Sequence, residues 1–189
     1  MPNRILICVA LTIVLAGCGP SAEQKAAGIK AFASVQQVLQ HPRCQNCHIE
    51  GDAPLQFDSG LAHAQNVMRG DAGMGAPGLP CSSCHGERNP PESYGPLAPP
   101  GAPHWKLPPP NQKMAWLGLD SAALCSRLKD PAQNGGRDLA ALLHHVSEDA
   151  LVLWGWNPGG TRAPVAMPHA EFVAAFKTWV DAEGPCPTR

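Results

Sequence analysis

Two short segments of the chain carry the same arrangement of cysteine and histidine. Residues 44–48 read CQNCH and residues 81–85 read CSSCH. This CxxCH pattern is the attachment motif of c-type haem. Thiols at this spacing reach the two vinyl groups on one edge of a porphyrin, and the next imidazole turns onto the iron. The sequence therefore predicts two covalently bound haem c groups, attached through Cys44, Cys47, Cys81 and Cys84, with His48 and His85 as iron ligands.

Chance, zinc and a redox dithiol fit the two motifs less well than haem does. A chain of this composition is expected to hold about 0.01 CxxCH matches by chance, and this chain holds two. Paired CxxC motifs also occur in four-cysteine zinc sites, but zinc does not require histidine directly after both pairs, and the gap from Cys47 to Cys81 is long for a zinc ribbon. A redox-active dithiol is the third alternative, although no βαβ pattern surrounds either motif.

The N-terminal segment predicts export. Arg4 precedes an apolar run over residues 5–16. A bilayer crossing needs about 20 residues, so this run fits a secretory signal instead. Residues 15–18 read LAGC and resemble the lipobox of bacterial lipoproteins, which implies removal of residues 1–17 and lipidation of Cys18. The alternative is an ordinary signal peptide; in either case the mature chain enters an oxidising compartment.

Two cysteines near the C-terminus remain after these assignments. They are Cys125 and Cys186. In an oxidising compartment we expect them to form a disulfide. It would close a loop of about 60 residues and tie the end of the chain to its body.

The polypeptide that positions these residues is expected to be helix and loop. Nine of the 21 residues from 90 to 110 are proline, which excludes regular structure there. A loop this long in a compact domain usually wraps around a ligand. Apolar periodicity and capping residues predict helices over 22–40, 121–129, 139–146 and from Pro168 onward, with a short turn at 149–154. The predicted fold class is mainly α with long Pro/Gly-rich loops and little or no β.

These features divide the chain into four parts. The signal peptide covers 1–17, the lipidated N-terminus and leading helix 18–40, the dihaem-binding region 41–115, and a helical C-terminal region closed by the disulfide 116–189. Charged residues make up only 15% of the chain and the formal net charge is −1. Such a chain has no strong positive field, so no nucleic-acid partner is expected.

The ligand on the opposite face of each iron largely sets the potential and the task of a haem. His63 lies 15 residues after His48, and a short loop would bring it over the first haem. His104 lies 19 residues after His85, at the end of the proline-rich loop, where prolines would present it rigidly. A solvent-facing histidine is the alternative at both positions. The other candidate ligands are Met68, Met74, Met114, His145 and Met167.

Basic and aromatic residues supply candidates for holding the porphyrin itself. Guanidinium groups suit carboxylates such as haem propionates. The sequence does not rank the basic candidates, which are Arg69, Lys106, Arg137 and Arg162. Tryptophan suits the porphyrin edge, with core or interface packing as the alternative; the candidates are Trp105, Trp116, Trp154 and Trp156.

The lipobox and the two CxxCH motifs resemble those of small dihaem cytochrome c lipoproteins of Gram-negative bacteria. More loosely, PHW at 103–105, MAW at 114–116, and KDP at 129–131 with NGG at 134–136 are similar to a group associated with periplasmic molybdenum hydroxylases of the isoquinoline oxidoreductase kind. The resemblance implies a cytochrome c-like dihaem domain, lipid-anchored to a bacterial membrane in the periplasm.

Such a protein would be an electron carrier rather than an enzyme. It would relay single electrons from a periplasmic redox enzyme, a dehydrogenase, to a respiratory acceptor. Two alternatives stay open on the sequence alone: a peroxidase-like dihaem enzyme with a vacant haem face, and a non-haem zinc-binding lipoprotein.

Overall fold

The structure, a computed structural model, describes residues 19–188 of the chain. The expected signal peptide and the expected lipidation site at Cys18 lie outside the described residues. Helices predominate, and strands are few and short, so the expectation of a mainly α chain with long loops is confirmed. Within the described residues, no helix combines the length and hydrophobicity that a membrane crossing requires.

Seven α-helices are found in the described part of the chain. They are α1 (Ala22–Leu39), α2 (Pro42–Gln45), α3 (Ser121–Lys129), α4 (Pro131–Asn134), α5 (Leu139–Glu148), α6 (Ala150–Leu153) and α7 (His169–Asp181). Short 3-10 helices lie at Ala64–Asn66, Cys81–Ser83, Glu92–Tyr94, Pro110–Gln112 and Trp154–Trp156. Two antiparallel hairpins complete the set, β1 (Leu55–Gln56) with β2 (Leu61–Ala62), and β3 (Gly75–Ala76) with β4 (Leu79–Pro80).

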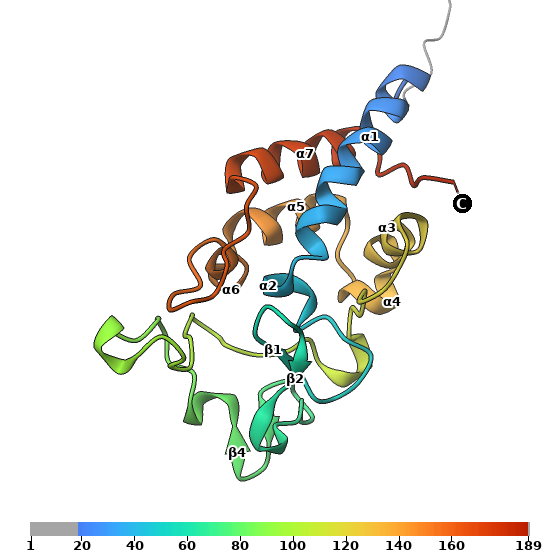
Figure 1. Cartoon of the computed structure of the whole chain (residues 1–189). Helices are drawn as coiled ribbons and strands as arrows, with labels where there is room; N and C mark the ends of the chain where they lie inside the picture. The colour runs from blue at the N-terminus through green and yellow to red at the C-terminus, as the bar shows by residue number, and fades with distance from the viewer. Residues whose placement is uncertain (1–18, 189) are drawn as a thin grey trace, which may run out of the picture.

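The helices gather in one part of the molecule, and the loops that carry β1–β4 form the other (Figure 1). Helix α7 packs along α1, where the rings of Phe32 and Trp179 lie 5.2 Å apart between centroids. Gly28 lies where these helices approach most closely, because a Cβ atom there would lie 2.6 Å from that of Ala182. The neighbouring Ile29 is 37% exposed, since Gly28 rather than Ile29 faces α7.

Side-chain caps set the starts of the C-terminal helices. Asp120 accepts from the Ala123 amide at 2.7 Å, and Asp138 accepts from the Ala141 amide at 2.8 Å. Each bond satisfies one of the backbone donors that a helix start leaves open. Pro168 precedes the first turn of α7 as its N-cap, one residue before the position predicted for it. The predicted short turn at 149–154 is helix α6, capped by Asp149.

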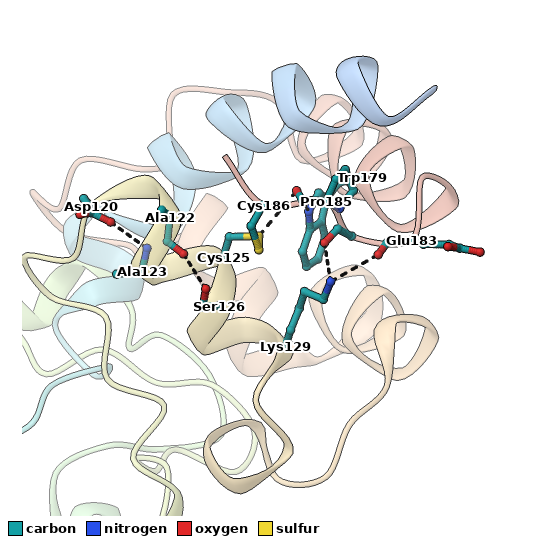
Figure 2. The surroundings of a disulfide bond; sticks show 11 residues. Asp120, Ala122, Ala123, Cys125, Ser126, Lys129, Trp179, Glu183, Pro185 and Cys186 are labelled. Carbon is teal, nitrogen blue, oxygen red and sulfur yellow. Dashed lines mark hydrogen bonds between the residues drawn. A yellow bond between two sulfur atoms is a disulfide. The ribbon is translucent and has the colours of Figure 1, made fainter. Parts of the chain in front are cut away.

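A disulfide fixes the C-terminal tail against α3 (Figure 2). It joins Cys125 and Cys186, the two cysteines expected to pair, with Cα atoms 5.5 Å apart. Next to it, the Trp179 indole donates to the Pro185 carbonyl at 3.0 Å and the Lys129 ammonium donates to the Gly184 carbonyl at 2.7 Å. The tail is therefore tied both to α3 and to α7.

A buried arginine organises the loops. Arg69 is 1% exposed, and its guanidinium donates to the backbone carbonyls of Ile49 at 3.0 Å, Gly51 at 2.8 Å and Pro108. A buried guanidinium is stable only when its donors are satisfied, and here one side chain joins segments nearly 60 residues apart. Hydrogen bonds from Arg69 thus hold the loop segments together, whereas apolar packing holds the helices together.

Candidate functional site

The first CxxCH segment is built onto the end of the helical core. Helix α2 begins at Pro42 and is capped by His41, and the next turn brings His48 against Trp116. The two rings stack in parallel, with centroids 3.6 Å apart and planes inclined by 10°. Trp116 is buried and its indole donates to the Leu39 carbonyl at 2.7 Å. The end of α1 therefore fixes Trp116, and Trp116 fixes the plane of the His48 ring.

The second CxxCH segment repeats this arrangement in the loops. Cys81–Ser83 forms a 3-10 turn directly after β4, and His85 stacks on Trp105 with centroids 4.2 Å apart and planes inclined by 6°. Trp105 in turn meets the edge of Trp154 at 4.9 Å. The Trp154 indole donates to Asn89 at 3.1 Å, which connects the second segment to the end of α6. Two tryptophans expected near the porphyrins, Trp105 and Trp116, thus orient the histidine rings.

Both histidines use the same ring nitrogen to reach the backbone. His48 Nδ1 lies 2.9 Å from the Met114 carbonyl, and His85 Nδ1 lies 2.7 Å from the Pro100 carbonyl. A carbonyl only accepts, so Nδ1 carries the proton and, in a neutral ring, Nε2 keeps its lone pair. Burial lowers the pKa of His48 to about 3 and also lowers that of His85, which favours the neutral ring. A metal-binding histidine has this protonation state and this contact to the backbone.

The thiols of the two segments are free. None of Cys44, Cys47, Cys81 and Cys84 forms a disulfide, and Cys84 is exposed. Burial raises the pKa of Cys44 to about 12 and that of Cys47 to about 11, and it raises the pKa of Cys81 as well. Among the residues described, no three His, Cys, Asp or Glu side chains are arranged to hold a metal ion. The two thiol pairs thus do not come together as the four ligands of one zinc ion there.

The structure brings His63 close to the second motif. Its ring faces the second motif, with its centroid 6.2 Å from that of His85 and the planes inclined by 68°. The expectation that His63 serves the first haem stays a prediction; the ring contact that the structure shows for His63 is to His85. His63 follows the β1–β2 hairpin, and its amide donates to the Pro54 carbonyl at 2.8 Å. His104 is exposed, and within residues 19–188 its ring contacts neither His48 nor His85.

The remaining candidate ligands lie in varied surroundings. Met68 is 36% exposed and Met74 is 58% exposed, whereas Met114 is buried in the core. Met167 packs against the same core. His145 is half-buried on α5, where its Nδ1 lies 3.2 Å from the Asp149 carboxylate, and burial lowers its pKa. His145 therefore has its Nδ1 engaged as His48 and His85 do, in its case with a carboxylate.

The structure ranks the basic residues and adds one that the sequence did not single out. The donors of Arg69 are used by backbone carbonyls, and Arg137 binds within its own turn at Asn134. Arg162 is half-buried and holds the Gly159 and Ala98 carbonyls. The added residue is Arg43, which directly precedes Cys44. The Arg43 side chain is 8% exposed.

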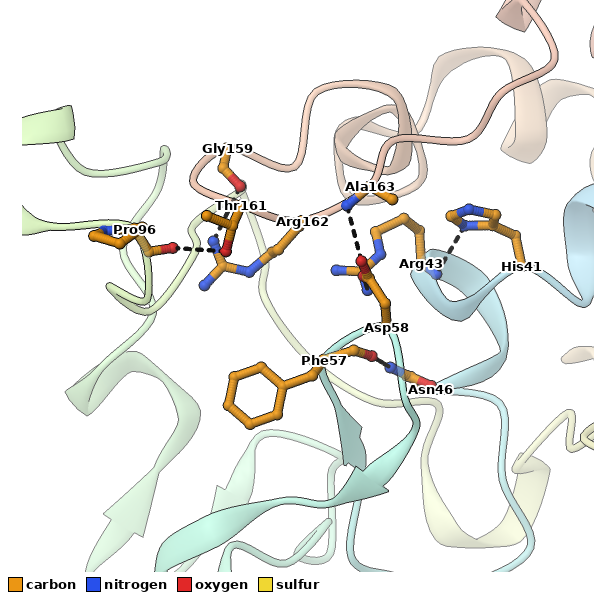
Figure 3. A network of polar contacts seen from close by, with 10 residues as sticks. All are labelled: His41, Arg43, Asn46, Phe57, Asp58, Pro96, Gly159, Thr161, Arg162 and Ala163. Carbon is orange, nitrogen blue, oxygen red and sulfur yellow. Dashed lines mark hydrogen bonds and ion pairs between the residues drawn. The ribbon is translucent and has the colours of Figure 1, made fainter.

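Arg43 has one buried donor that is left without a partner. Arg43 pairs with Asp58, which also accepts from the Ala163 amide at 3.2 Å (Figure 3). Its Nε atom is buried without a hydrogen-bond partner, which is costly for a charged donor. A carboxylate such as a haem propionate would satisfy this donor. No sequence signal identified Arg43, since its burial depends on Asp58 and on the Trp154 ring 5.7 Å away.

The residues present therefore fit two c-type haems: two free thiol pairs, two neutral histidines with Nδ1 on the backbone, and a buried arginine with an open donor. Compared with family models, with curated proteins and with solved structures, the chain matches none of them.

Proposed function

We propose that the chain is a dihaem c-type cytochrome that transfers single electrons in the periplasm. The observation that carries this is the repeated unit at the two motifs. In each, a CxxCH histidine donates Nδ1–H to a backbone carbonyl, stacks on a tryptophan and keeps Nε2 free. Two matching units in one chain suit a relay between two redox centres.

The roles of the residues follow from their positions. Cys44 and Cys47 would hold the first haem and Cys81 and Cys84 the second, while His48 and His85 would bind the irons. Haem supplies reversible one-electron chemistry. The protein holds each imidazole in one orientation, because Trp116 and Trp105 fix the ring planes and the Met114 and Pro100 carbonyls fix the tautomer. Fixed ligands reduce the reorganisation that accompanies each change in charge.

Export and anchoring belong to the same proposal. The lipobox supports a mature chain that is attached to a bacterial membrane through lipid on Cys18. Its partners would be a periplasmic dehydrogenase as donor and a respiratory acceptor. The Cys125–Cys186 disulfide supports an oxidising compartment.

One observation keeps a second candidate function, a peroxidase-like enzyme. Among the described residues, the only ring paired with His48 is that of Trp116, whereas His85 is also paired with His63; His145 is near enough to lower the pKa of His48 but forms no ring contact with it. An iron with an open face would bind small ligands and support turnover.

Redox titration of the matured protein separates the two functions. An electron carrier takes up two electrons per chain reversibly and consumes no peroxide in the steady state. Continuous consumption of hydrogen peroxide with a reduced donor would instead establish the enzyme. Cyanide or carbon monoxide binding then counts the open haem faces per chain.

A further inference from the structure

The segment between the two motifs holds His63 beside the second motif rather than the first. The β1–β2 hairpin is anchored on the first motif, because the Leu55 amide donates to the Asn46 carbonyl at 2.9 Å. The His63 amide then donates to the Pro54 carbonyl at 2.8 Å, which fixes the point where the chain leaves β2. The ring contact between His63 and His85 shows that the end of this hairpin lies close to the second motif.

The distance between the His63 and His85 rings can be compared with that expected for two ligands of one metal ion. With a metal–nitrogen bond of about 2.0 Å and a ring nitrogen about 1.2 Å from its ring centre, two imidazoles on opposite sides of one metal have centres about 6.4 Å apart. The centres of His63 and His85 are 6.2 Å apart. This distance is close to that of two imidazoles on one metal ion, and the planes of the two rings are inclined by 68° rather than stacked.

The hydrogen bonds of the two rings match as well. His63 Nδ1 lies 2.9 Å from the Ala64 carbonyl, as His85 Nδ1 lies 2.7 Å from the Pro100 carbonyl. A carbonyl partner places the proton on Nδ1 in both rings, so the lone pair is on Nε2. Neither Nε2 has a hydrogen-bond partner within residues 19–188. Each histidine therefore keeps a metal-binding nitrogen unused.

We propose that His63 is the sixth ligand of the haem attached through Cys81 and Cys84, opposite His85. This inference rests on the proposed dihaem function and deepens it. His104, the ligand expected from sequence, has a left-handed backbone (φ 59°) and an exposed ring with no contact to His85 among the described residues. His63 and His85 would then both hold the second haem, one from the segment after the first motif and one from the second motif.

The test uses full-length matured protein, because the thioether bonds keep both haems attached when a histidine is removed. Low-spin ferric haem per chain is counted by electron paramagnetic resonance. His63→Ala and His85→Ala are expected to lose the same one low-spin haem, so the double variant loses no more than either single variant. His104→Ala is the matched control and loses none. Added imidazole should restore the low-spin haem of His63→Ala, which shows an open ligand position rather than misfolding.

Two results would overturn the inference. One is a double variant His63→Ala/His85→Ala that has lost two low-spin haems, because His63 would then serve the first haem. The other is His63→Ala with an unchanged spectrum. A wild-type chain that carries no haem, counted as pyridine haemochrome, would instead overturn the proposed function, so the two failures are distinguishable.

Discussion

The two CxxCH segments present their histidines in the same way but from different surroundings. The first is continuous with the helical core: Cys44 packs against the core cluster, and Trp116 beneath His48 is 5% exposed. The second lies between loops, where Cys84 is exposed and Trp105 is half-buried. The same local chemistry is therefore supported by apolar packing in one place and by hydrogen-bonded loops in the other.

This difference indicates a division of tasks. Large exposed apolar side chains occur in the loops between residues 57 and 97; they are Phe57, Leu61, Met68, Met74, Tyr94 and Leu97. If the second segment binds haem as proposed, the wide apolar faces of the porphyrin would supply packing that the first segment obtains from the helices. This less buried site would then be the one that exchanges electrons with a partner.

The largest expected effect comes from removing the tryptophan beneath each histidine. Trp116→Ala should lower the free energy of unfolding by about 3–5 kcal/mol, because it leaves a cavity in the core. Trp105→Ala should lower it by less than about 2 kcal/mol, since Trp105 is half-buried and its removal exposes less apolar surface. Chemical denaturation of both matured variants measures the difference. Equal losses of unfolding free energy in the two variants would show that both segments are packed equally well into the folded protein.

The disulfide should stabilise the helical part without touching either haem. Cys125 and Cys186 are 61 residues apart, and closing a loop of this length contributes about 4 kcal/mol in the chain-entropy model. The Cys125→Ala/Cys186→Ala variant should therefore unfold at lower denaturant concentration. Its haem spectra and both reduction potentials should match those of the wild type at temperatures well below unfolding. A changed haem spectrum would contradict the separation of the two regions.

The smallest expected effect is a change in the reduction potential of one haem when the positive charge of Arg162 is removed. The Arg162 guanidinium helps to lower the pKa of His85, so its positive charge acts on the second segment. Arg162→Gln should favour the oxidised form of the proposed second haem by about 1 kcal/mol, the order of magnitude of a single charge interaction near a protein surface. Spectroelectrochemical titration should show a lower potential for that haem alone. Arg137→Gln is the control, because Arg137 binds within its own turn; an equal shift there would indicate a general charge effect.

Local rules explain what the sequence predicted. The helices after Asp120 and Asp138 begin where predicted because a cap bonds to an amide three residues away. The CxxCH motifs and the Cys125–Cys186 pair were likewise found from residue type and spacing. The haem assignment itself stays a proposal.

Contacts between distant segments explain what the sequence did not predict. The pairing of His48 with Trp116 and of Arg43 with Asp58 depends on where the loops return. Spacing suggested that His63 would serve the first motif, and only the tertiary structure shows its ring 6.2 Å from that of His85. Ile29 has the apolar side chain and spacing of a buried helix residue and is nevertheless 37% exposed. Periodicity alone does not show which side of α1 the neighbouring helix α7 covers.

Counting haem per chain tests the central claim most directly. The chain would be produced in a host that matures c-type cytochromes, and its haem measured as pyridine haemochrome against protein concentration. A dihaem cytochrome would carry two haems per chain, and the variants Cys44→Ser/Cys47→Ser and Cys81→Ser/Cys84→Ser would carry one haem each. A wild-type chain with no covalent haem, and with zinc bound instead, would contradict the proposal.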